Sequence, residues 1–343
     1  MAGHKYKGYP NSGRPLKISF DVDGNDTPPA QLTIEETESR PRYTGVGKGL
    51  CFMSFGSGSS GNCAYLGTPR GGILIDAGIA PPPKSGTRKK KKGDHEVLNL
   101  ADAFAELARN GVSPDMIKGI LVTHAHQDHM RCAYHVAHRC KCLVYCTWGT
   151  MEQMLTRHAV SRFIQDYHRA VFKEIPFRIL DMEITPFETS HDVKGCVGFN
   201  IEYEGERFVV GSDMGAITER ASYYMSRANY LMIESNYDLD MLNRGKYPDY
   251  LKERVKGAEG HLDNEVAARF IAEHYHEGLH YVFMCHLSND NNTPEKASVT
   301  MRRALEERGL SVGDASNSAS QRDCNVQIYV LPRYTSSSWF VLA

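Results

Sequence analysis

Short apolar runs separated by glycine- and serine-rich segments dominate the middle of the chain, and this pattern predicts β-strands. In the first half, such runs occupy residues 50–56, 62–67 and 71–78. Over residues 99–111 the apolar positions recur at intervals of three and four, and an Asn-Gly pair closes the segment, so a helix is expected there.

The second half of the chain repeats this order of elements. Strands are expected over residues 187–192, 197–205, 207–213, 230–236 and 279–288. Helices are expected over residues 264–278 and 294–309, where the apolar spacing changes to three and four positions. Two successive sets of strands and helices predict a sandwich of two β-sheets with helices on the outer faces.

Two segments depart from this pattern. Residues 1–48 are rich in Pro, Gly and Thr and contain two short alternating runs, so they are expected to form an N-terminal extension, either a hairpin or a loose arm, ahead of a main domain at residues 49–343. A loop insertion at residues 81–94 carries five consecutive basic residues, Arg88–Lys92. Such a block is typical of a solvated, mobile loop, and a phosphate-contacting arm is the alternative.

Composition excludes some classes of protein. The chain has 343 residues, of which 41% are hydrophobic, and this is enough for a folded protein with a sizeable core. The net charge of -1 provides no general attraction to nucleic acid or to an anionic membrane. No signal peptide is recognisable, and no apolar run approaches the roughly 18 residues that span a bilayer. A soluble, cytoplasmic protein without membrane contact is therefore expected.

The segment "GILVTHAHQDHM" concentrates candidate metal ligands. An apolar run with the character of a buried strand leads directly into His124, His126, Asp128 and His129. Imidazole and carboxylate groups suit borderline divalent ions, and ligands at this spacing, where a strand enters a helix, reach two nearby points in space. The HxHxDH pattern therefore predicts a metal site.

Three further candidates each follow an apolar run in the second half, namely His191, Asp213 and His286. A single histidine after a strand is usually a surface residue or a satisfied core residue. The recurrence at three strand ends, together with the HxHxDH pattern, favours a site for two metal ions.

These residues, with Asp76 in "LIDAG", occur in the order found in the metallo-β-lactamase superfamily. The chain further resembles the YycJ (WalJ) group of bacterial phosphodiesterase-like members over residues 51 to about 300, in motifs such as "FGSGSSGNCAYL", "THAHQDH", "IESNYDLDML" and "CHLSNDNNTPEKA". The resemblance implies an α/β (α+β) fold, a four-layer αββα sandwich with the metals at one edge.

The resemblance also implies a role for each candidate ligand. The first of two divalent ions would be held by His124, His126 and His191, and the second by Asp128, His129 and His286. Asp213 would bridge the two ions, and Asp76 would support the ligand loop without coordinating. Zinc, manganese and iron all suit such a set of ligands.

A proton donor for the leaving group is implied as well. His261 in "GAEGHLDNE" resembles the general acid of tRNA-processing members of the superfamily, and Glu234 resembles its carboxylate partner. The catalytic residues expected are therefore Asp128, His261 and Glu234, with a helix cap as the alternative for His261. Asp263 stands where the group more often has serine, which adds a negative charge near this position.

Two loops are candidates for substrate contact. The Gly-Ser segment at residues 56–62 is more often a tight hairpin, but beside two metal ions its backbone amides and Ser59, Ser60 or Asn62 could orient a phosphate. In "HLSNDNN", the side chains of Asn289, Asn291 and Asn292 either contact substrate or cap the following helix.

The expected function is a dinuclear metal-dependent hydrolase. The resemblance implies a phosphodiesterase or nuclease that acts on DNA, like a 5′–3′ exonuclease, through a metal-bridging hydroxide. Hydrolysis of a small ester, a thioester or a cyclic phosphodiester is one alternative. A non-catalytic, metal-containing nucleic-acid-binding module is another, although the complete set of ligands argues against it.

Overall fold

The structure is a computed structural model that describes residues 49–81, 98–156, 160–315 and 324–342. The predicted N-terminal extension and all but residue 81 of the predicted basic insertion lie outside the described residues. Their organisation therefore stays a prediction.

The first sheet has seven strands in the order β15-β1-β2-β3-β4-β5-β6. Their bounds are β1 Cys51–Gly56, β2 Cys63–Thr68, β3 Gly71–Ile75, β4 Ile117–Leu121, β5 Leu143–Cys146, β6 His168–Ala170 and β15 Phe340–Val341. The strands from β3 to β6 run parallel to one another, whereas β15, β1, β2 and β3 pair antiparallel.

The second sheet has eight strands in the order β13-β14-β12-β11-β10-β9-β8-β7. Their bounds are β7 Phe177–Ile179, β8 Met182–Glu188, β9 Val197–Tyr203, β10 Glu206–Gly211, β11 Tyr230–Glu234, β12 Tyr281–Cys285, β13 Val312–Asp314 and β14 Val326–Val330. The strands β10, β11, β12, β14 and β13 are parallel, and β7 to β10 form an antiparallel meander.

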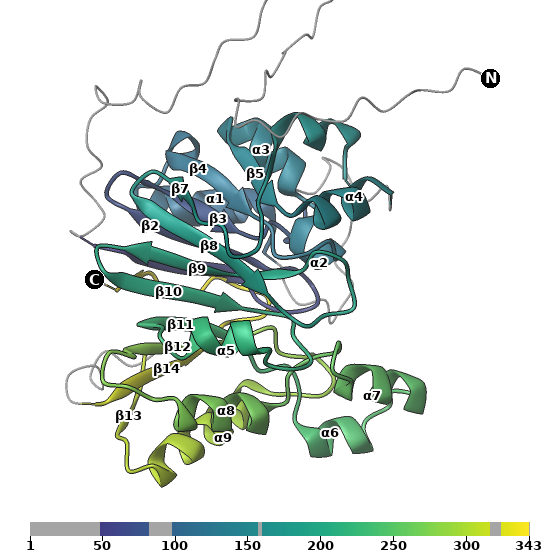
Figure 1. Ribbon diagram of the computed structural model, residues 1–343, viewed down its shortest axis with the longest axis vertical. Coiled ribbons are helices and arrows are strands. Elements are labelled where there is room, and N and C mark those ends of the chain that lie inside the picture. The colour runs from purple at the N-terminus through teal and green to yellow at the C-terminus, as the bar shows by residue number, and fades with distance from the viewer. Residues whose placement is uncertain (1–48, 82–97, 157–159, 316–323, 343) are drawn as a thin grey trace, which may run out of the picture. The chain divides into compact units, whose positions relative to one another are not determined.

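Helices cover the outer face of each sheet (Figure 1). The helices of the first half of the chain are α1 Leu100–Arg109, η2 Pro114–Met116, α2 Gln127–Met130, α3 Ala133–Cys140, α4 Trp148–Thr156 and η3 Arg162–Tyr167. The helices of the second half are α5 Glu219–Met225, α6 Leu239–Arg244, α7 Asp249–Lys256, α8 Asn264–Glu273 and α9 Pro294–Glu307. Within the described ranges, every helix is too short or too polar to span a lipid bilayer.

The core between the two sheets is aromatic. The ring of Phe52 in the first sheet lies 5.0 Å from that of Phe208 and 4.7 Å from that of Phe283 in the second. Successive residues of β10 point to opposite faces, so Phe208 packs between the sheets while Val209 packs against the outer helices. Alternation of this kind buries both faces of each sheet and produces four layers, and the predicted αββα sandwich is confirmed.

Several element boundaries differ from the expected ranges, and the two largest differences are in β8 and α8. The strand expected over residues 187–192 is β8, which ends at Glu188, because Glu188 makes the last pairing with β9 and Ser190 instead bridges to Ala216. The helix expected to continue to residue 278 is α8, which ends at Glu273, because the backbone turns at the C-cap residue His274.

Candidate metal centre

Most of the candidate ligands lie where neighbouring parallel strands end. In the first sheet, Asp76 directly follows β3, and His124 lies three residues beyond the end of β4. In the second sheet, Glu234 is the last residue of β11, and Asp213 and His286 closely follow β10 and β12. Because parallel neighbours bring their carboxyl ends to one edge of a sheet, residues far apart in the sequence meet here.

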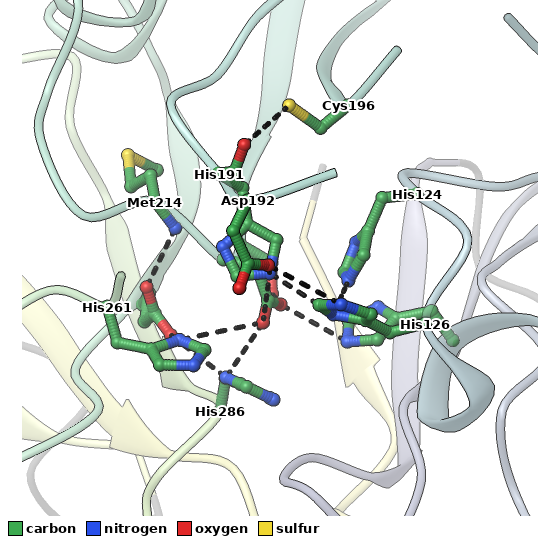
Figure 2. A network of polar contacts seen from close by, with 12 residues as sticks. His124, His126, His191, Asp192, Cys196, Met214, His261 and His286 are labelled. Carbon is green, nitrogen blue, oxygen red and sulfur yellow. Dashed lines mark hydrogen bonds and ion pairs between the residues drawn. The ribbon is translucent and has the colours of Figure 1, made fainter. Parts of the chain in front are cut away.

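Three histidines form one cluster at this edge (Figure 2). Nδ1 of His126 lies 3.0 Å from Nε2 of His124 and 3.2 Å from Nε2 of His191. On the other side of its ring, His191 places Nδ1 3.1 Å from the carbonyl oxygen of Gly260. The outer nitrogen of His126, Nε2, lies 3.5 Å from Oδ1 of Asp192.

These contacts fit a bound cation. A neutral imidazole carries a proton on one nitrogen and a lone pair on the other. Because the carbonyl of Gly260 only accepts hydrogen bonds, the proton of His191 belongs on Nδ1, and Nε2 of His191 turns a lone pair toward the cluster. Nδ1 of His126 lies between this atom and Nε2 of His124, at 3.2 and 3.0 Å, so three imidazole nitrogens lie together. A divalent metal ion is the cation that imidazole lone pairs bind.

A second cluster contains Asp128, His129 and His286. Oδ2 of Asp128 lies 3.5 Å from Nε2 of His286 and 3.6 Å from Nε2 of His129. Behind this cluster, Oδ2 of Asp76 lies 2.7 Å from Nδ1 of His129, and the same carboxylate accepts hydrogen bonds from the backbone and hydroxyl of Thr123. Asp76 thus leaves Nε2 of His129 turned toward the cluster, a geometry typical of a residue that orients a ligand.

Asp213 lies between the two clusters. One carboxylate oxygen, Oδ2, is 3.2 Å from Nε2 of His129, and the other, Oδ1, is 3.2 Å from Nδ1 of His286 and 3.9 Å from Nε2 of His191. The Ser212 hydroxyl donates to Oδ2 at 2.7 Å. Asp213 therefore contacts members of both histidine sets and is itself almost completely buried.

Three of the residues at this edge have left-handed backbone conformations. The φ angles of Asp76, Asp213 and His286 are 58°, 53° and 53°. Each such residue costs roughly 1–3 kcal/mol, and residues of this kind concentrate at functional sites. All three come just after a strand, so this conformation ends the strand and redirects the chain where the candidate ligands begin.

His261 and Glu234 form a hydrogen-bonded pair beside the clusters. Nδ1 of His261 lies 2.8 Å from Oε1 of Glu234, and Oε2 of Glu234 accepts the backbone N–H groups of Met214 and Leu262. The His261 ring centroid lies 5.3 Å from that of His286. The N-cap of α8 is Asp263 and not His261, so the alternative role of His261 as a cap is wrong.

Comparison with known proteins agrees with this geometry. The sequence profile of the Metallo-beta-lactamase superfamily matches residues 56–225. Exodeoxyribonuclease YycJ from Bacillus anthracis is 31% identical over 271 residues, which cover 78% of this chain and 93% of that protein. The chain belongs to the metallo-β-lactamase superfamily. It is therefore a metal-dependent hydrolase, which sets aside the non-catalytic alternative.

Other members of the superfamily are similar as well. Exodeoxyribonuclease WalJ from Streptococcus pneumoniae serotype 2 is 27% identical over 266 residues, which cover 77% of this chain and 91% of that protein. Among solved structures, the metallo-beta-lactamase fold protein YhfI from Bacillus subtilis aligns with a TM-score of 0.56 at 13% identity, covering 84% of this chain and 99% of that one. An identity this low shows the fold alone, and it confirms the metallo-β-lactamase fold.

The Gly-Ser loop of this superfamily member contacts the second cluster. Nδ2 of Asn62 lies 2.9 Å from Nε2 of His129 and 3.3 Å from Oδ2 of Asp128. Ser59 is exposed on the outer side of the loop. Sequence reasoning missed Ser57, whose hydroxyl accepts the backbone N–H of His286 at 2.9 Å, since nothing distinguishes it from the other serines of this loop.

The asparagines after His286 make hydrogen bonds to other parts of the protein. Asn289 accepts hydrogen bonds from Arg333 and Tyr334. Asn292 is buried and donates to the backbone carbonyls of two residues after β11, at 2.9 and 3.0 Å. The N-cap of α9 is Thr293, so of the two alternatives for these asparagines, the one in which an asparagine caps this helix is wrong. Their substrate contact stays a prediction, but the hydrogen bonds assign them a structural part.

Sequence reasoning also missed Asp192 and Arg254. Asp192 lies 3.5 Å from His126 and 3.6 Å from Nε2 of His191, and its Oδ2 accepts two hydrogen bonds from Arg254 of α7. Asp192 directly follows the candidate ligand His191 in the sequence, but β8 ends four residues earlier, at Glu188. Arg254 lies in a helix with no pattern of ligands, so only the structure brings it to the site.

Protonation separates the two clusters. Burial, followed by the neighbouring His129, holds the pKa of His124 well below its usual value, and burial and His191 lower the pKa of His126 to about 4. Both imidazoles are therefore neutral near pH 7, and neutral imidazole is the form that binds metal ions.

The second cluster is rich in negative charge. Burial opposes the charged form of His286, but Asp213, Asp128 and Glu234 together raise its pKa to about 10. Burial likewise opposes charge on His129, whose pKa Asp213 and other carboxylates nevertheless raise well above the usual value. The buried carboxylates here thus require positive charge beside them. Without metal ions, protonated His129 and His286 supply this charge, and bound metal ions would supply it in their place.

Proposed function

We propose that this hydrolase binds two divalent metal ions and cleaves phosphodiester bonds of DNA from an end, as a 5′–3′ exonuclease. One observation carries the dinuclear part of the proposal. The buried carboxylate of Asp213 lies beside His129 through Oδ2 and beside both His286 and His191 through Oδ1, so it reaches members of both clusters and would bridge two ions.

The roles proposed for the ligands follow from the two clusters. The first ion is assigned to His124, His126 and His191, and the second to Asp128, His129 and His286. Zinc, manganese and iron all suit this mixture of imidazole and carboxylate. When bound, a pair of such ions supplies an activated water and stabilises the attacking and leaving oxygens of an in-line displacement.

Protein side chains perform the remaining steps. Asp76 holds His129 in one tautomer through the 2.7 Å contact with Nδ1. His261, oriented by Glu234, would donate a proton to the leaving oxygen. Burial by itself lowers the pKa of His261, but the neighbouring carboxylate of Glu234 outweighs this effect, and the pKa is raised. Its side chain is 22% exposed, which leaves the ring accessible to a substrate.

DNA as the substrate rests on the relatives and on the openness of the site. The proteins YycJ and WalJ are named exodeoxyribonucleases. The side chains of His126, Asp128 and Asp192 are between 22% and 25% exposed, so this side of the centre meets solvent. A long substrate can therefore approach without being enclosed.

A panel of substrates tests the proposal. Metal-analysed protein is incubated with single- and double-stranded DNA and RNA labelled at either end, and with bis(p-nitrophenyl) phosphate. The expected result is two metal ions per chain and release of nucleotides from the 5′ end of DNA. Activity on esters or thioesters without activity on DNA would instead support the small-substrate alternative.

Two variants make the test specific. Asp128→Ala should lower kcat on DNA by at least about 100-fold, because a carboxylate of the metal site is lost. Asp166→Ala, which removes an exposed aspartate of η3, should behave like the unaltered protein. Full activity of the Asp128 variant, or a single metal ion per chain in active protein, contradicts the dinuclear mechanism.

A further inference from the structure

The helix α7 is fastened to the candidate metal centre at its carboxyl end. The backbone N–H of His261 donates to the carbonyl of Val255 at 2.9 Å, and the hydroxyl of Ser190 donates to the carbonyl of Ala258 at 2.6 Å. Ser190 directly precedes the candidate ligand His191, so the end of α7 and the segment after it are held beside His191 and His261. These two hydrogen bonds therefore fix the position of this end of α7 relative to the site.

Arg254 of α7 is held beside the first cluster by one carboxylate. Nε of Arg254 donates to Oδ2 of Asp192 at 2.9 Å, and Nη2 donates to the same oxygen. Oδ1 of Asp192 lies 3.5 Å from Nε2 of His126. The guanidinium has five N–H groups, and its side chain remains 57% exposed, so donors are left for an anion in front of the site.

Tyr250 lies one helical turn before Arg254 and is 77% exposed. Residues four apart on a helix are neighbours on its surface, about 5–6 Å apart at Cβ. The buried side of α7 is formed by Leu251 and Val255, which pack with Tyr237 and Leu242. Tyr250 and Arg254 are each one position before these two, so they share a strip that borders the buried side.

We propose that α7 binds the nucleotide next to the cleaved phosphodiester, with Arg254 donating to its phosphate and Tyr250 stacking on its base. This inference rests on the proposed function and adds the form of the substrate. A base that stacks on a tyrosine has left its own base stack, so DNA at this position is single-stranded or frayed. Exposed aromatic rings and cationic side chains together are the means by which proteins bind single strands.

Binding and kinetics test the two side chains separately. The metal-loaded protein is titrated with a fluorescent, cleavage-resistant phosphorothioate single strand at several salt concentrations. Tyr250→Ala should weaken binding about tenfold, and Tyr250→Phe, which keeps a ring, should restore it. Arg254→Ala should lower the slope of log Kd against log salt by about 0.7, the contribution of one phosphate on a single strand.

Matched controls identify effects that come from stability alone. Arg178→Ala removes an arginine that makes the same two-nitrogen contact with one oxygen of Glu183, at the start of β8, whereas His191 follows the other end of that strand. Phe163→Ala removes an exposed ring, 51% accessible, from η3. Neither should change the affinity or the salt slope.

The outcomes separate this inference from the proposed function. If the unaltered protein cleaves no DNA, the proposed function fails. If it cleaves DNA but Tyr250→Ala binds as tightly as Phe163→Ala and Arg254→Ala keeps the full salt slope, the role of α7 is overturned. A higher KM on single-stranded DNA for both α7 variants supports it. Failure of Tyr250→Phe to restore binding also contradicts stacking.

Discussion

Nδ1 of His261 lies 2.8 Å from Oε1 of Glu234, a carboxylate with no exposed side-chain surface. Burial disfavours the ionised form of Glu234, yet His261 and the hydrogen bonds around it lower the pKa of this carboxyl. The pKa of His261 is correspondingly raised. The pair therefore favours the protonated form of the His261 imidazole near neutral pH, and this is the form that a general acid must have.

His261→Ala is expected to lower kcat on DNA by roughly 100-fold or more, the range of a general acid. The loss should be much smaller on bis(p-nitrophenyl) phosphate, because nitrophenolate leaves without a proton. Steady-state kinetics on both substrates measure the difference. Glu234→Gln should show the same selectivity, and His138→Ala, on the exposed side of α3, should show none. An equal loss on both substrates argues against proton donation.

Asp76→Asn is expected to weaken metal binding by about 10- to 100-fold while the protein stays folded. The reason is that the neutral amide replaces the carboxylate that accepts the hydrogen bond from Nδ1 of His129 and so orients its ring. Competition with a chromogenic chelator measures the affinity. Asp181→Asn is the control, since Asp181 also accepts a hydrogen bond from a threonine, Thr68 at 2.8 Å, away from the clusters. Unchanged affinity in the Asp76 variant contradicts the supporting role.

Gly215→Ala is expected to destabilise the fold by about 1–3 kcal/mol and to reduce activity, because there is no space for a side chain. A Cβ at Gly215 would lie 2.3 Å from the carbonyl oxygen of Gly257 and 2.3 Å from the nitrogen of Gly260. The segment displaced carries the acceptor of His191 and leads into His261. Urea unfolding and DNA cleavage measure both effects.

Gly257→Ala tests whether this effect is steric. A Cβ there would meet its nearest atom, the carbonyl oxygen of Glu253, at 3.3 Å. The free energy of unfolding of this variant should fall by less than that of Gly215→Ala, because a contact at 3.3 Å is relieved by a shift of a few tenths of an ångström. Equal destabilisation by the two substitutions would assign the effect to the loss of glycine and not to the contact.

His168 predicts a dependence of stability on pH. Burial lowers the pKa of this histidine below its usual value of 6.5, and Nε2 contacts the carbonyl of Cys146 at 3.1 Å. Its contribution is fully present above pH 6.5, the unfolded value, and is lost as the pH falls toward the lower folded pKa, because the unfolded chain binds the proton more tightly.

His168→Phe should therefore lower the free energy of unfolding by about 1–3 kcal/mol at pH 7.5, because the buried carbonyl of Cys146 loses its hydrogen-bond partner. The difference in unfolding free energy between the two proteins should narrow between pH 7 and pH 5. Urea unfolding at several pH values measures it. A difference that stays constant or widens on acidification contradicts the assigned protonation.

Local patterns were sufficient for the fold class and for much of the candidate site. The apolar run at residues 207–213 and the three- and four-residue spacing over residues 99–111 predicted elements that the structure contains. The candidate ligands were found because polar residues directly after apolar runs are visible in the sequence. Extents were less accurate, as with β8, because pairing with β9 ends where the chain turns toward the site.

Contacts between distant segments could not be predicted in the same way. Arg254 and Asp192 are 62 positions apart, and neither belongs to a periodic pattern that would relate them. The left-handed conformations of Asp76, Asp213 and His286 are equally hidden, because aspartate and histidine adopt ordinary conformations at most positions.

The sequence by itself determined where the strands lie and which candidate ligands follow them, because hydrophobic spacing and side-chain chemistry can be seen within a few consecutive positions. Tertiary structure alone decided which of these side chains face one another and how they are protonated. The physical reason is that the 2.8 Å contact of His261 with Glu234 and the burial of Asp213 depend on the packing of two sheets, and small distances and desolvation set the charges.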